Sequence, residues 1–311
     1  MQNNEQRLDA AESAFFARQL ESIDTQVYTK FKAVAKARSL IPTQQGVDEN
    51  ARVYTWRMYD HYGVAKIISN SADDLPSADA DGEEQSQIIK NLGLSYGWDI
   101  FEIKAAMKAG FDLDNEKATA TRAGIERLID NLLATGDAVY GIEGLLAITG
   151  AATYTASTKG AGGLTWAVAT PDEIVGDITG AITARRLALK GAGGPEFEKW
   201  SIVLPIDRYA QIAQQRMGDG SDKTILKYVL ESSPWIESIT DWSKCTGAGA
   251  ASADRSVTYV RDPSVVAAVV PMEYRTLPPE QRNLRYIVNA VASTGGVVCR
   301  YPLAVVYTDG I

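Results

Sequence analysis

The chain has 311 residues, of which 45% are hydrophobic and 23% charged, so it is long enough to bury one large core or two smaller ones. Its 39 acidic and 31 basic residues give a net charge of −8, which argues against a domain that grips nucleic acid by neutralising phosphates. The 26 glycines and 11 prolines are too few for a disordered or collagen-like chain.

The N-terminal stretch predicts a helix between Glu5 and Arg38. Apolar residues recur there at steps of three and four, which places them on one face of a helix. They are Phe16, Leu20, Ile23, Val27, Phe31 and Val34. A helix of that length spans about 50 Å at 1.5 Å per residue. Two interpretations stay open: the helix packs in the core with a frayed start, or part of it lies on a neighbouring chain.

The next segment predicts a long hairpin with a broad acidic tip. Arg52–Tyr59 is rich in aromatic and β-branched residues, which suits a strand. Asp60–Gly63 predicts a bend, and Val64–Ser69 continues extended. Ser71–Gln87 is small, polar and acidic and predicts a loop, after which Ile88–Trp98 predicts the returning strand. An isolated two-stranded ribbon is marginal in water, so we expect this one to pack on something else, such as another chain.

The acidic tip offers one candidate calcium loop, which would begin at Ser77. Asp79, Asp81 and Gly82 match its positions three, five and six. Position one is a serine, however, and position twelve is Ile88 instead of the bidentate glutamate that holds the ion. A solvated loop is therefore the stronger interpretation, and we expect no metal site.

Helices are predicted in the middle of the chain, where apolar residues recur at helical spacing between capping signals. The predicted helices are Asp99–Lys108, Asp114–Ala134, Pro171–Lys190, Asp207–Met217 and Asp222–Glu231. The second has an apolar stripe formed by Ile125, Leu128, Ile129, Leu132 and Leu133. The last is expected to begin after Ser221 as its N-cap.

Strands are predicted mainly in the last third of the chain, from runs of β-branched and aromatic residues. They are Trp200–Leu204, Ile236–Trp242, Val257–Arg261, Val265–Val270, Leu284–Val291 and Val297–Tyr307. Helices in the middle with strands at both ends indicate an α+β fold, because a parallel α/β sheet would require regular alternation.

The sequence contains no complete motif for catalysis or cofactor binding. Glycine clusters begin at Gly160, Gly191 and Gly247, but none has the Lys-Ser or Lys-Thr of a phosphate-binding loop or the spacing of a dinucleotide-binding turn. The single histidine, His61, is interpreted as a bend residue instead of a catalytic base. We therefore expect a protein that is not an enzyme and that carries no cofactor.

The cysteines and tryptophans also give no sign of a catalytic or cofactor site. Cys245 and Cys299 form no CxxC, which excludes a disulfide framework and an iron–sulfur site and indicates reduced, intracellular thiols. No apolar run approaches the roughly 20 residues of a membrane span, and the charged N-terminus lacks a signal-peptide core. Six tryptophans without a basic cluster are expected to anchor the core or a subunit interface. They are Trp56, Trp98, Trp166, Trp200, Trp235 and Trp242.

Several segments, in order, resemble a family of tailed-bacteriophage major capsid proteins. They are Arg57–Pro76 (RMYDHYGVAKIISNSADDLP), Ser95–Lys104 (SYGWDIFEIK), Thr170–Ile174 (TPDEI), Ala253–Arg255 (ADR), Arg261–Pro263 (RDP), Leu277–Glu280 (LPPE) and Tyr301–Gly310 (YPLAVVYTDG). The resemblance covers residues 50–311, and the first 50 residues match least well.

The resemblance implies the Hong Kong-type phage capsid fold, an α+β fold with an N-arm, an extended E-loop hairpin, a peripheral domain with a long spine helix, and an axial domain. The implied boundaries are 1–50 for the N-terminal arm, 51–98 for the E-loop hairpin, 99–164 for the peripheral domain with the spine helix, 165–262 for the axial domain, 263–297 for the peripheral strands and 298–311 for the C-terminal axial strand.

The resemblance also implies a function. The chain would self-assemble into hexamers and pentamers of an icosahedral shell that encloses double-stranded DNA without sequence-specific binding. The shell would be assembled in the host cytoplasm, with portal, scaffolding and decoration proteins as further partners. The alternative is the shell of an encapsulin-like cellular nanocompartment, and an enzyme with an unrecognised site is a third. The expected assembly contacts lie in the hairpin: Trp56, Met58, Tyr59, Asp73 and Asp74.

Overall fold

The structure is a computed structural model that describes residues 35–65, 67, 77–109, 113–160, 162–191, 196–218, 220 and 222–311. These residues belong to one compact unit, Ala35–Ile311. The helix predicted between Glu5 and Arg38 lies outside the described residues except at its end. There a short helix, α1, spans Ala37–Leu40.

The helices of the described part agree with prediction to within three residues at each end. They are α2 (Ile100–Ala109), α3 (Leu113–Thr135), α4 (Pro171–Gly191), α5 (Ile206–Gln214) and α6 (Ile225–Ser232). Short 3₁₀ turns occur at Trp166–Val168, Ser243–Cys245, Ala250–Ser252 and Pro302–Ala304. Helix α6 differs in its cap: the Thr224 side chain, not Ser221, accepts a hydrogen bond from the Lys227 amide.

The strands of the described part form four sheets. One is the hairpin of β1 (Val53–Tyr62) and β2 (Asp79–Ile88). A long sheet joins β3 (Lys90–Asp99), β9 (Met272–Thr276), β10 (Glu280–Arg282) and β11 (Arg285–Thr294). A small one pairs β8 (Val266–Val269) with β12 (Gly296–Cys299). The fourth has the order β4 (Ala152–Tyr154), β13 (Val305–Asp309), β7 (Arg255–Tyr259), β5 (Trp200–Leu204) and β6 (Ile236–Asp241).

The hairpin exists and its first arm confirms the predicted strand Arg52–Tyr59, but the predicted bend and returning arm are wrong. Antiparallel pairing runs from Val53–Ile88 to Tyr62–Asp79, so Asp60–Tyr62 continues β1 where a bend was expected, and His61 is an exposed strand residue. The returning arm is β2, which occupies half of the predicted acidic loop. The segment expected to return, now β3, pairs instead with β11. Strand β2 escaped prediction because its polar side chains face solvent on both sides and show no apolar alternation.

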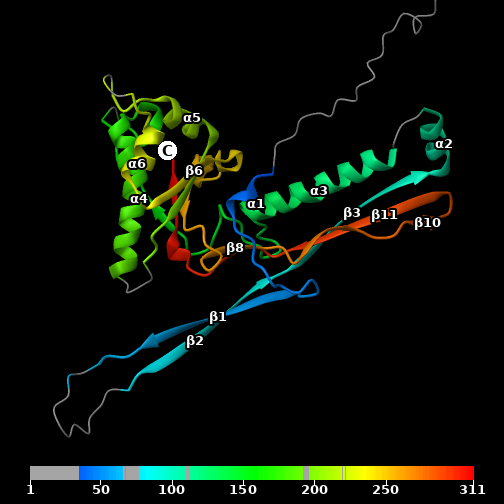
Figure 1. Ribbon diagram of the computed structural model, residues 1–311, viewed down its shortest axis with the longest axis horizontal. Helices are drawn as coiled ribbons and strands as arrows, with labels where there is room; N and C mark the ends of the chain where they lie inside the picture. The colour runs from blue at the N-terminus through cyan, green and yellow to red at the C-terminus, as the bar shows by residue number, and fades with distance from the viewer. Residues whose placement is uncertain are drawn as a thin grey trace, which may run out of the picture. The chain divides into compact units, whose positions relative to one another are not determined.

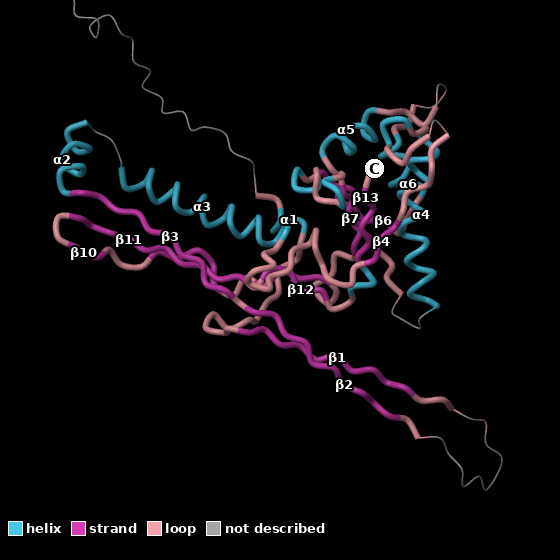
Figure 2. Tube along the Cα trace, turned by 180° about the vertical axis from the view of Figure 1, so that it is seen from behind, coloured by secondary structure: helices cyan, strands magenta, loops and turns pink. Residues whose placement is uncertain are grey.

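Helix α3 lies along the long sheet (Figures 1 and 2). Strands β3 and β11 pair over ten residues, from Lys90–Thr294 to Asp99–Arg285. The apolar stripe predicted on α3 is buried except for Leu128, which is 44% exposed at the margin of the stripe. At Gly124 the helix approaches β3 closely, since an added Cβ would stand 2.9 Å from a Leu94 methyl carbon.

The five-stranded sheet carries the other part of the core. Helices α4, α5 and α6 pack around it (Figure 2). Trp166, Trp200 and Trp242 are fully buried there, as predicted for core anchors, whereas Trp56, Trp98 and Trp235 are half-buried. The predicted strand Val297–Tyr307 is two strands, because the 3₁₀ turn at Pro302 interrupts it. Strands β9 and β10 were missed, because neither has a buried position and so neither shows an apolar run.

Candidate assembly surfaces

The hairpin places the predicted assembly contacts on two different faces. Side chains alternate along a strand and lie beside their directly paired partners. Trp56 and Met58 therefore share one face of β1, and Tyr59 lies on the other. Tyr59 is 64% exposed and packs over Gly82, its partner on β2. Asp73 and Asp74, the other two predicted contacts, lie outside the described residues.

The base of the hairpin is anchored within its own chain. The rings of Tyr54 and Trp56 stack, with 5.9 Å between centroids and 27° between planes. Both pack against a small apolar cluster that contains Val269 and Val298. The Tyr54 hydroxyl also accepts a hydrogen bond of 2.8 Å from the Arg300 guanidinium. Trp56 thus holds the hairpin to the body of its own chain.

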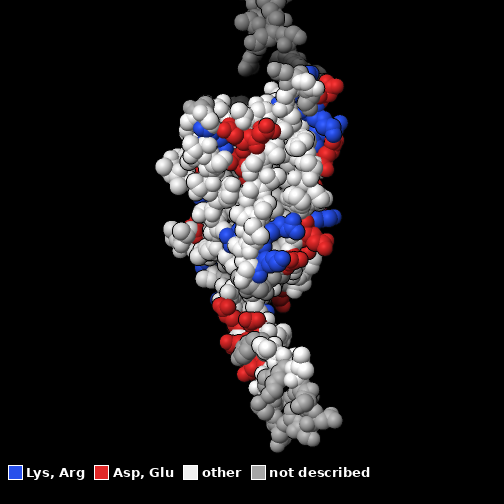
Figure 3. All heavy atoms as spheres, turned by 90° about the vertical axis from the view of Figure 1, so that its left-hand side faces the viewer, with Lys and Arg blue, Asp and Glu red and all other residues white. Residues whose placement is uncertain are grey.

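Beyond its base the hairpin is acidic. Its described strands carry five carboxylates and one arginine, which sum to −4: Asp60, Asp79, Asp81, Glu83 and Glu84 against Arg57. The arginine is paired, since Arg57 Nε lies 2.9 Å from Glu84 Oε2 on the face shared with Tyr59. Figure 3 shows acidic side chains gathered on the hairpin in the lower part of that view. The opposite face, which contains Met58, has carboxylates and no basic residue between Trp56 and Asp60.

Residues 36–44, which we call the strap, join the described chain to several elements. The Ala37 amide donates a hydrogen bond of 2.8 Å to Asp130 on α3. The Leu40 carbonyl accepts one of 2.7 Å from the Tyr259 hydroxyl on β7, and burial raises the pKa of that phenol. Tyr259 therefore stays protonated and donates. Sequence periodicity alone predicted a helix here and not these long-range contacts.

Charged residues of the strap reach two different sheets. Lys36 Nζ lies 2.7 Å from Asp241 Oδ2 on β6 of the five-stranded sheet. Arg38 Nη1 lies 2.8 Å from Glu273 Oε1 on β9 of the long sheet. The strap thus bridges the two large sheets at the point where the chain leaves its first 34 residues.

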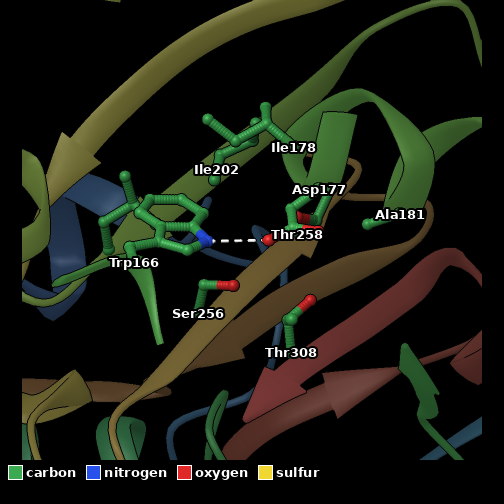
Figure 4. A pocket seen from close by; sticks show the side chains of 9 residues that line it. Trp166, Asp177, Ile178, Ala181, Ile202, Ser256, Thr258 and Thr308 are labelled. Carbon is green, nitrogen blue, oxygen red and sulfur yellow. Dashed lines mark hydrogen bonds between the residues drawn. The ribbon is translucent and has the colours of Figure 1, made fainter. Parts of the chain in front are cut away.

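A buried carboxylate organises the loop before α4. Asp177 Oδ1 accepts hydrogen bonds from the Ser157 amide and hydroxyl at 3.0 and 2.9 Å. Asp177 Oδ2 accepts one from Trp166 Nε1 at 2.9 Å (Figure 4). The Lys159 ammonium is ion-paired to Oδ2, and both charged side chains are at most 1% exposed. The cavity beside them measures about 10 Å³, room for no more than one water. This centre fastens the loop and is too small for a substrate.

Sequence reasoning missed this centre entirely. Ser157 and Lys159 sit in a Thr- and Ala-rich stretch, and Asp177 follows 18 residues after the lysine. No spacing rule links a loop lysine to a helical aspartate at that separation. The only available signal was the pair of acidic residues in the first turn of α4, where Glu173 accepts the Gly160 and Thr170 amides, both at 2.7 Å.

The thiols and the acidic residues were also considered as sites for nucleophilic or metal chemistry. Burial raises the pKa of the Cys245 and Cys299 thiols to about 12 each, so both stay protonated and unreactive. Among the described residues, no group of three or more His, Cys, Asp or Glu side chains gathers to hold an ion. The calcium loop considered at Ser77 is incompatible with the structure, because Asp79–Gly82 is extended strand. Within the same residues, no helix has the length and hydropathy needed to span a membrane.

Solved structures with the same architecture are capsid subunits and related shells. "The capsid of Myoviridae Phage XM1" superposes with a TM-score of 0.80 at 19% identity, covering 96% of this chain and 99% of that one. "Capsid of native GTA particle computed with C5 symmetry" gives a TM-score of 0.64 at 11% identity, covering 97% and 99%. A virus-like particle from Pyrococcus furiosus gives 0.54 at 12%, covering 87% and 90%. At these identities the similarity establishes the fold.

The family comparison identifies the chain more specifically. Residues 63–311 match the family described as major capsid protein, which is most of the chain and agrees with the span of the sequence resemblance. No curated protein matches the sequence. The family match favours a phage capsid over a cellular nanocompartment, and membership of a structural family argues against an enzyme. The chain belongs to the major capsid protein family and has the Hong Kong-type α+β fold of phage capsids.

Proposed function

We propose that this chain self-assembles into hexamers and pentamers that build an icosahedral shell around double-stranded DNA. The observation that carries the proposal is the family match over residues 63–311, on a fold whose hairpin keeps large side chains exposed. A closed shell repeats heterologous contacts around local rotation axes. The shell is assembled in the host cytoplasm and remains in the virion, where portal, scaffolding and decoration proteins join it.

The proposal assigns parts of the chain to parts of a shell subunit. The division follows the resemblance: residues 1–50 as N-arm, 51–98 as E-loop, 99–164 and 263–297 as peripheral domain, and 165–262 and 298–311 as axial domain. Two features support it. Helix α3, with 23 residues, is the longest of the described helices, as expected of a long spine helix. The five-stranded sheet draws its strands from the two segments assigned to the axial domain, plus β4.

We assign inter-subunit contacts to the hairpin residues Trp56, Met58, Tyr59, Asp73 and Asp74. Exposure supports Tyr59 most directly, because a tyrosine left 64% exposed gives a large, rigid contact area to a partner at little entropic cost. Met58 is half-buried on the opposite face and adds a flexible apolar contact. Trp56 contributes by holding the base of the hairpin in place.

The charge of the chain suits enclosure of DNA without tight binding. A net charge of −8 provides no surplus of cations to release counterions from DNA, so binding by phosphate neutralisation is weak. The shell therefore confines DNA mechanically, and DNA sequence plays no part.

The proposal is tested by electron microscopy and sedimentation of the purified chain. The wild type is expected to form closed particles or capsomers. Tyr59→Ala is expected to keep the thermal stability of the wild type and lose particles, while Tyr228→Ala, at an exposed tyrosine on α6, keeps both. A chain that stays monomeric under every assembly condition would contradict the proposal.

A further inference from the structure

One end of the long sheet carries an apolar face that nothing in the described chain covers. Helix α2 begins directly after β3, and its first amide donates a hydrogen bond of 3.0 Å to the Leu284 carbonyl in the turn between β10 and β11 (Figure 1). Three large apolar side chains are exposed there: Phe101 by 67%, Met107 by 77% and Leu284 by 56%. Exposed apolar side chains at one end of a folded domain indicate a contact surface for another macromolecule.

This face is also basic. Phe101, Lys104 and Lys108 stand at helical spacings of three and four, so they line one side of α2. The Lys104 ammonium lies over the Phe101 ring at 5.9 Å from its centroid, and both lysines are exposed. We call the exposed side of α2, with these three residues and Met107, the α2 face.

The carboxylate of the same helix does not cancel this positive charge. Glu102 accepts a hydrogen bond of 2.7 Å from Lys117 on α3, and that bond lowers the pKa of Glu102. Asp99, just before the helix, accepts the Phe101 amide at 2.9 Å and so caps the helix. The two lysines of the α2 face are left to attract an external anion.

The Met58 face of the hairpin is a surface of complementary character, because it combines an apolar side chain with carboxylates. Asp60 and Asp81 are direct cross-strand partners there, and Glu83 follows on the same face beside Met58. Like charges placed directly opposite in a sheet are destabilising. These three carboxylates repel one another and have no cation beside them on this face. A basic partner would relieve that repulsion.

A single chain cannot bring these two surfaces together. Only Ile89 separates β2 from β3, and β3 then runs ten residues, about 33 Å at 3.3 Å per residue, before α2 begins. The hairpin and α2 thus lie at opposite ends of β3 (Figure 2). The complementary surfaces are available only to a second copy.

We propose that the Met58 face of one chain's hairpin docks on the α2 face of a second copy. In this contact Asp81 and Glu83 pair with Lys104 and Lys108, and the Met58 side chain lies against the exposed apolar residues of α2. The inference rests on the proposed function, since it names the contact by which shell subunits join. It assigns a role to α2, which the predicted assembly contacts did not include.

Charge reversal tests the contact. D81K/E83K and K104E/K108E are each expected to raise the concentration needed for assembly by about tenfold or more, because attraction becomes repulsion. Controls with the same change in net charge are E196K/E198K and K190E/K199E, at exposed positions outside both faces. If the melting temperature shows that a reversed chain does not fold, the neutral variants D81N/E83Q and K104Q/K108Q are measured in its place. Normal assembly of both reversed or both neutral variants would overturn the inference.

Mixing decides whether the two faces meet each other. In a ring of six that alternates the two reversed chains, every hairpin again faces an α2 of opposite charge, so an equimolar mixture is expected to recover hexamers that neither chain forms alone. A ring of five cannot alternate, so the measured outcome is the formation of hexamers and not of closed particles. A mixture that stays as defective as its components would refute the docking while leaving the proposed function intact. Absence of wild-type particles would instead refute the proposed function, and the inference with it.

Discussion

Replacing Asp177 by asparagine is expected to destabilise the chain severely. The substitution keeps the shape of the side chain but removes the charge that neutralises Lys159, whose side chain is 0% exposed. Breaking a buried ion pair by removing one partner costs about 3–5 kcal/mol, because a buried charge is left uncompensated. At about 2–4 °C per kcal/mol for a domain of 150–250 residues, the melting temperature falls by roughly 6–20 °C.

The two charges of this pair are not equivalent, which gives a sharper form of the prediction. Without Lys159, the Asp177 carboxylate still accepts three hydrogen bonds, from Ser157 and Trp166, which compensate part of the cost of its burial. Without the carboxylate charge, Lys159 keeps only the Ser157 hydroxyl at 3.4 Å. K159M is therefore expected to lose less stability than D177N, and K159M/D177N is expected to be more stable than D177N alone.

Thermal unfolding of unassembled subunits, followed by circular dichroism, measures these differences. Hydrogen exchange locates them: the amides of the loop before α4, including that of Ser157, should lose protection first in D177N. The reasoning would be refuted if D177N lost less than about 1 kcal/mol, the range of a solvent-exposed pair. An equal loss in K159M would refute the asymmetry.

Three further predictions follow from backbone, acid–base and thiol chemistry. G296A should be destabilised by more than the ~1–2 kcal/mol of a left-handed backbone, because at φ +75° its Cβ would also stand 2.5 Å from the Glu143 carbonyl; G46A, at φ +76° with open space, should show the backbone cost alone in a thermal melt. The hydrogen bond from Arg255 lowers the pKa of Asp309, so its stabilisation is present above the unfolded pKa of about 3.9 and is lost as pH falls through the folded value. D309N should therefore melt below the wild type at pH 7, and the difference should shrink as the pH falls below the unfolded value. Both buried cysteines, with pKa values raised to about 12, should resist iodoacetamide at pH 8 until the chain is unfolded; rapid labelling of the native protein would contradict their burial.

Sequence patterns predicted the elements whose apolar residues are buried within their own chain. The stripe of Ile125, Ile129 and Leu133 indicated α3 to within one residue at each end, because a helix on a sheet must present apolar residues at helical spacing. Strand β5, buried at every position, was equally clear from its sequence WSIVL. In these cases the periodicity and the burial have the same cause.

The buried Lys159–Asp177 pair could not be predicted, for a different reason. A charged side chain is normally assigned to the surface, because burial is costly unless a partner and further hydrogen bonds compensate it. That compensation comes from a loop and a helix that meet only after folding, and no local pattern records it. The same holds for Asp130 on α3, which accepts the amide of Ala37 at the start of α1, 93 residues away in the chain.

The exposure of strand β2 explains why its sequence did not predict it, and it also bears on the proposed assembly. Its sequence, DADGEEQSQI, has no apolar alternation, and its side chains are exposed at most positions when the chain is considered alone. A two-stranded ribbon is at best marginally stable in water, and here only the base is held, by Tyr54 and Trp56. The remainder needs a surface on which to pack, and a carboxylate-rich face requires a basic one. Because β2 has no buried face in its own chain, its sequence shows no apolar alternation. A strand whose packing partner belongs to another chain is expected to have this same property.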